Sequence, residues 1–89
     1  MANKRVLKRA INLVCDELFA EAVAATLYGN DHHRDNTEAV LYCIMKTQRD
    51  YVCRVSHPEP GMPQRLYYKN LREKFSAQVS EIVDQINNL

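Results

Sequence analysis

The stretch HPEPGMP, residues 57–63, decides how this chain folds, because three prolines and a glycine within seven residues interrupt both helices and central strands. His57 precedes Pro58, and the residue before a proline is driven away from the helical region of backbone space. Pro63, in contrast, suits the first turn of a following helix. The stretch therefore predicts one helix that ends before His57 and another that begins near Pro63.

Upstream of this stretch, residues 36–56 have the apolar spacing of an amphipathic helix. Asp35, followed three residues later by Glu38, resembles a capping box at its start. The side chains expected in the core are Val40, Ile44, Thr47, Tyr51 and Val55. Residues 51–55 are also rich in strand-forming side chains, so a hairpin across the proline stretch with residues 65–68 is an open alternative.

Two further helices are predicted, over residues 3–28 and residues 63–87. Gly29 and Asn30 suit the end of the first, since both adopt the left-handed conformation that terminates helices. The expected core side chains are Leu7, Ile11, Val14, Leu18, Ala22 and Ala25 in the first helix, and Leu71, Phe75, Val79, Ile82 and Ile86 in the third. The fold class is therefore all-α, one domain over residues 1–89, forming a three-helix up-down-up bundle.

Composition supports this class: 46% of the 89 residues are hydrophobic, whereas two glycines and three prolines are too few for the turns of a many-stranded sheet. No apolar run is long enough to span a membrane, and charged residues interrupt any signal peptide at the N-terminus. The three cysteines, Cys15, Cys43 and Cys53, form no Cys-x-x-Cys pair. We expect buried free thiols in a reducing compartment, and hence a cytoplasmic protein.

The chain has more apolar surface than a three-helix bundle needs, and surplus apolar stripes typically mark interfaces. In the first helix a second apolar line has members seven residues apart, with Ala24 beside it. We expect it, together with apolar residues flanking the core stripe of the second helix, to bind a second copy of the chain or a partner helix. The predicted interface residues are Val6, Leu13, Ala20, Ala24, Leu27, Leu41, Met45 and Val52.

Basic residues concentrate in two stretches that an up-down-up bundle brings to one end. Most acidic residues lie outside these stretches, so such a bundle would gather them at the other end, and a chain with a net charge of only +1 would be dipolar. This basic end predicts an alternative function, the binding of nucleic-acid phosphates, or else contact with the acidic end of an antiparallel copy. The residues concerned are Lys4, Arg5, Lys8, Arg9, Arg54, Arg65, Lys69 and Arg72.

Four other groups of residues are weaker candidates. His32 and His33 lie in an acidic loop whose spacing fixes no third metal ligand, and Glu17 and Glu21 have no Glu-x-x-His partner of the kind that di-iron bundles use. Cys15 has no histidine nearby in the sequence to activate it as a nucleophile. Residues 65–72 mix basic and aromatic side chains as single-strand binders do, although core packing is the more ordinary use of these rings.

No catalytic motif is present, so we expect a non-enzymatic module without metal, cofactor or small-molecule substrate. The primary prediction is a homodimeric protein-interaction module, and the alternative is a nucleic-acid-binding module.

Overall fold

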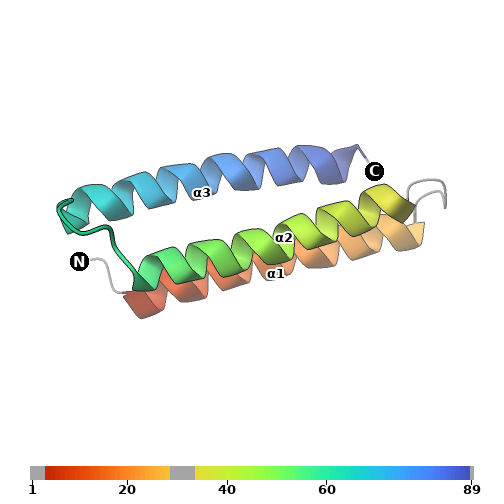
Figure 1. Cartoon of the computed structure of the whole chain (residues 1–89). Helices are drawn as coiled ribbons and strands as arrows, with labels where there is room; N and C mark the ends of the chain where they lie inside the picture. The colour runs from red at the N-terminus through yellow and green to blue at the C-terminus, as the bar shows by residue number, and fades with distance from the viewer. Residues whose placement is uncertain (1–3, 29–33, 89) are drawn as a thin grey trace.

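A computed structural model describes residues 4–28 and 34–88, and these residues form a three-helix up-down-up bundle. Helix α1 spans Lys4–Tyr28, α2 spans Arg34–Ser56 and α3 spans Gln64–Asn87. Figure 1 shows α1 and α2 lying side by side along their whole length, with α3 returning along them, so that the start of α1 lies at the same end as the start of α3. The predicted fold class and number of helices are confirmed.

The proline stretch ends and restarts helices as the sequence predicts. Helix α2 ends at Ser56, directly before His57, and Pro63 precedes the first residue of α3. Between them, the Met62 N–H donates to the Glu59 carbonyl oxygen at 3.4 Å and Gly61 has φ +86°. Proline second and a left-handed glycine third are the arrangement of a type II turn, where a side chain at Gly61 would be strained.

Residues 51–55 are helical, so the hairpin alternative is wrong. Tyr51 and Val55 are four residues apart on one face of α2, and both are buried. Burial of this face against the neighbouring helices outweighs the intrinsic strand preference of the residues, because propensity differences are small beside the burial of large apolar side chains.

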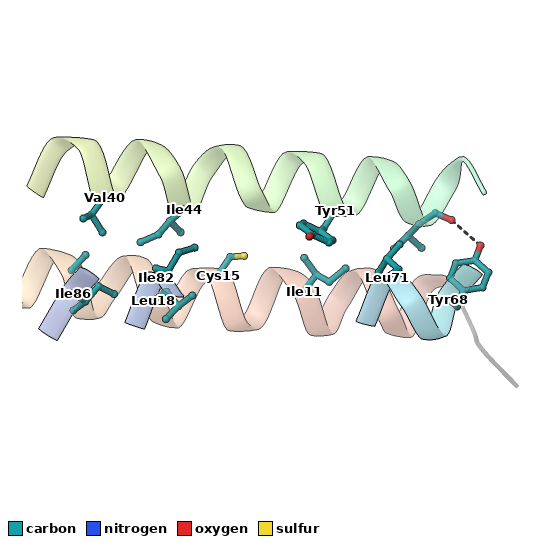
Figure 2. Close-up of a cluster of buried hydrophobic side chains, with 12 residues drawn as sticks. Ile11, Cys15, Leu18, Val40, Ile44, Tyr51, Tyr68, Leu71, Ile82 and Ile86 are labelled. Atoms are coloured by element: carbon teal, nitrogen blue, oxygen red, sulfur yellow. Dashed lines mark hydrogen bonds between the residues drawn. The ribbon is translucent and has the colours of Figure 1, made fainter. Parts of the chain in front are cut away.

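The core runs along the whole bundle (Figure 2), with α2 contributing the complete predicted stripe. On α1 the buried face is rotated slightly from the prediction: Cys15 is fully buried, whereas Leu7 and Val14 are only half-buried. The rotation follows from α1 packing mainly on α2 and much less on α3. The buried apolar residues are Ile11, Cys15, Leu18, Ala22, Val40, Ile44, Tyr51, Val55, Tyr68, Leu71, Ile82 and Ile86.

Phe75 and Val79 in α3 depart from the prediction, because they are half-buried and not fully enclosed. The Phe75 ring packs edge-on against Tyr51 of α2, with 5.2 Å between ring centroids. Helix α3 leans on α2 and has few contacts with α1, so the middle of α3 is covered from one side only.

Two tyrosines at the start of α3 bind the end of α2. The Tyr68 hydroxyl donates to the Val55 carbonyl oxygen at 3.0 Å, and the Tyr67 hydroxyl reaches the carbonyl oxygens of Arg54 at 2.8 Å and His57 at 3.2 Å. The last carbonyls of a helix lack partners within the helix. These bonds satisfy them and fix α3 onto α2, so both rings have a structural role.

Candidate functional site

The second apolar line of α1 is exposed. Val6 is 60% exposed, Leu13 57% and Leu27 74%, and the alanines at positions 20 and 24 are exposed as well. At 3.6 residues per turn this line lies roughly opposite Ile11 and the other buried residues of α1. We call Val6, Leu13, Ala20, Ala24 and Leu27 the outer face of α1. The single chain leaves this predicted interface uncovered.

The predicted interface residues of α2 lie elsewhere. Leu41 and Val52 are half-buried against the core, and only Met45, at 55%, is exposed. Met45 and Val52 line a groove of about 510 Å³ between α1 and α2. The amide of Gln48 crosses between the two helices and donates to the side-chain oxygen of Asn12 at 2.9 Å. The structure therefore separates the predicted interface into the outer face of α1 and this side groove.

Sequence reasoning missed two exposed aromatic side chains. Phe19 of α1 is 37% exposed and lines a neighbouring hollow with Ala20 and Met45, and Tyr42 of α2 is 68% exposed. Both lie outside the core stripes of their helices, and this offset is the signal that would have identified them.

The basic residues separate into groups. Lys4 of α1 and Arg65, Lys69 and Arg72 of α3 line one cleft of about 780 Å³ between the two helices, together with a single acidic residue, Glu73. We call these four cations and the space between them the basic cleft.

The other cations of the predicted basic end lie apart from this cleft. Arg54 stacks over the Tyr51 ring, 4.9 Å from its centroid, and borders a separate hollow with Glu59 and Lys74. Arg9 is exposed and lies next to the outer face of α1, whereas Lys8 is half-buried. Arg5 is exposed and has an interaction within the chain.

The three cysteines differ in environment, and the prediction that all are buried is wrong for Cys53. Burial, and secondarily the nearby Asp16 carboxylate, raises the pKa of the Cys15 thiol to about 11, so it is a poor nucleophile. Cys53 is exposed, with its sulfur 3.8 Å from Nδ1 of His57. The spacing of four residues across the end of α2 could have revealed this pair. Nδ1 is also 3.0 Å from the Cys53 carbonyl oxygen, a contact that directs its proton to the backbone.

The remaining candidates give no site. The loop histidines His32 and His33 lie outside the described residues, and Glu17 and Glu21 are exposed. In residues 4–28 and 34–88, no three histidine, cysteine or acidic side chains lie close enough together to hold a metal ion. None of the helices in the described part of the chain has the length and apolarity needed to cross a membrane.

Comparison with protein families, characterised proteins and solved structures finds no match to this chain, so its function has to be argued from its own residues.

Proposed function

We propose that this chain is a small non-enzymatic protein-interaction module that forms a homodimer through the outer face of α1. The observation that carries the proposal is the exposure of an apolar line with a seven-residue repeat opposite the core. Such a repeat is typical of a helix that packs along another helix. The small side chain of Ala20 allows a second helix to approach closely.

The amount of exposed surface supports this proposal. The chain exposes 6623 Å², whereas a compact monomer of 10.3 kDa exposes about 5,400 Å². Its radius of gyration is 14.8 Å, against about 12 Å for a compact domain of this length. The molecule is a rod of 48 × 19 × 15 Å, and α1, with 25 residues, is about 37 Å long. Side-by-side pairing of two rods reduces the excess surface.

The charges along α1 favour a second copy in antiparallel orientation. Arg9 and Asp16 are exposed on the same edge of the outer face, and a twofold axis between antiparallel helices brings like edges together. When Leu13 lies near the axis, Arg9 of each chain lies close to Asp16 of the other, so the contact occurs twice. Val6 of each chain then packs on the partner's Ala20. A parallel pair would instead place Asp16 beside the partner's Glu17, which is repulsive. A helix of another protein would need the same apolar repeat, with an acidic residue opposite Arg9 and a basic residue opposite Asp16. A second, antiparallel copy supplies both.

The three free cysteines favour a reducing compartment, so we place the dimer in the cytoplasm. In the antiparallel register Ala24 and Leu27 lie beyond the overlap of the two α1 helices, which begin at Lys4. This difference between Leu13 and Leu27 gives the register a direct test.

In a chain with Cys43→Ser and Cys53→Ser, Leu13→Cys is expected to form a disulfide-linked dimer under mild oxidation, because the two copies of residue 13 face each other near the axis. Leu27→Cys, which is more exposed, is the matched control and is expected to stay uncrosslinked. Electrophoresis without reductant measures both. Equal crosslinking at both positions would indicate parallel pairing, and no crosslinking at residue 13 would contradict the proposed interface.

A further inference from the structure

We propose that the basic cleft between α1 and α3 binds the phosphate backbone of a nucleic-acid strand. Four cations from two helices that are distant in sequence line one cleft. Lys4 lies on one side, and Arg65, Lys69 and Arg72 lie on the other. Among the described residues, the cleft has a single carboxylate, that of Glu73. Like charges held this close repel one another, by about 1 kcal/mol for a near pair at the surface before salt screening. A bound polyanion relieves this repulsion.

The spacing of the cations fits a row of phosphates and not a single anion. Arg65, Lys69 and Arg72 lie on one face of α3, and seven residues of helix extend about 10 Å. Each strand of a stacked nucleic-acid helix carries one phosphate per about 3.4 Å of axis, so this row spans about three phosphates of one strand. Lys4 approaches the same row from α1, and the first turn of α3 contains no acidic residue to oppose it.

The aromatic residues decide the kind of recognition. The Tyr68 ring is 5% exposed and its hydroxyl is bonded to α2, and the Tyr67 ring packs edge-on against it with 5.3 Å between centroids. Tyr68 is buried, and the half-buried Tyr67 lines a separate hollow with Arg54 and Lys74. Neither ring therefore serves as a platform for stacked bases in the basic cleft. The site therefore reads phosphates and not base edges, so binding is independent of sequence and sensitive to salt.

The site is separate from the proposed dimer interface. Lys4 lies on the edge of α1 that faces α3, whereas Arg9 and Leu13 lie on or beside the outer face. A monomeric protein retains all four cations, so binding and dimerisation can fail independently.

The test is fluorescence anisotropy of a labelled 12-nucleotide single strand of mixed sequence at two salt concentrations. Four phosphate contacts predict that affinity falls about 50-fold between ~50 mM and ~200 mM salt, from a slope of about −0.7 per contact on logarithmic axes. The double variant Arg65→Ala with Arg72→Ala keeps two phosphate contacts. Its affinity is expected to be weaker at both salt concentrations and to fall only about 7-fold between them. Lys46→Ala with Arg49→Ala, two exposed α2 cations outside the cleft, removes the same charge and is expected to retain the 50-fold dependence.

Circular dichroism on each variant checks that the fold is intact, which is expected because all the replaced side chains are exposed. Absence of binding at ~50 mM salt, or an equal loss in both double variants, would overturn the proposal. Inorganic tripolyphosphate serves as a competitor. It is expected to compete less effectively per phosphate than the unlabelled strand, because the strand offers phosphates along the whole row of cations. Equal competition per phosphate would overturn the assignment to a nucleic-acid backbone.

Discussion

Leu13→Glu is expected to convert the dimer into a monomer at micromolar concentration. In the antiparallel register the two copies of Leu13 meet near the twofold axis, so the substitution places two carboxylates in an apolar contact without partners. The penalty for burying such groups is at least about 3 kcal/mol, which weakens association by about 100-fold or more. In the single chain Leu13 is 57% exposed, so the fold itself tolerates the change.

The matched control is Leu66→Glu. Leu66 is also an exposed apolar residue, at 46%, but it lies on the side of α3 away from the core. Its variant carries the same added charge and is expected to keep the mass of the wild type. If light scattering finds both variants dimeric, or both monomeric, the outer face of α1 is not the interface.

Leu18→Ala is expected to reduce the free energy of unfolding by about 2–5 kcal/mol, because the side chain is 5% exposed and its removal leaves a cavity between helices. A domain of this size has a total stability on the order of 5–10 kcal/mol, so this variant is close to unfolding. Urea titrations at equal protein concentration measure the loss, since dimerisation makes stability depend on concentration.

Leu66→Ala removes the same atoms from an exposed position and is expected to change stability by less than about 1 kcal/mol. Phe75→Ala is expected to cost less than its size suggests, because the ring is half-buried and contacts mainly α2. A larger loss for Phe75→Ala than for Leu18→Ala would mean that α3 packs more deeply than the structure shows.

The helices were predictable because their ends are determined locally. Pro58 ends α2 through sterics with His57, and the apolar spacing of α2 is complete because this helix contacts both neighbours. The buried side chains of α1 and α3 were less predictable, since they depend on how closely α3 packs against the other two helices. Cys15 is enclosed and Phe75 is not, and this difference arises from the position of α3, which no local pattern encodes.

The outer face of α1 and the basic cleft also differ in how far the sequence predicts them. The outer face of α1 was visible as a seven-residue repeat within one helix, and the structure leaves that repeat exposed. The sequence predicted only a general concentration of positive charge at one end, because Lys4 of α1 and Arg65 of α3 come together only when the three helices pack. Arg54 was grouped with them by its position in the sequence, but the side chain faces Tyr51.

The solution mass of the wild-type protein tests the central claim most directly. Size-exclusion chromatography with light scattering at low micromolar concentration is expected to give about twice the chain mass of 10.3 kDa, with a shift toward the single-chain mass on dilution. A mass of one chain at every concentration would contradict the account, because the outer face of α1 would then remain exposed to solvent.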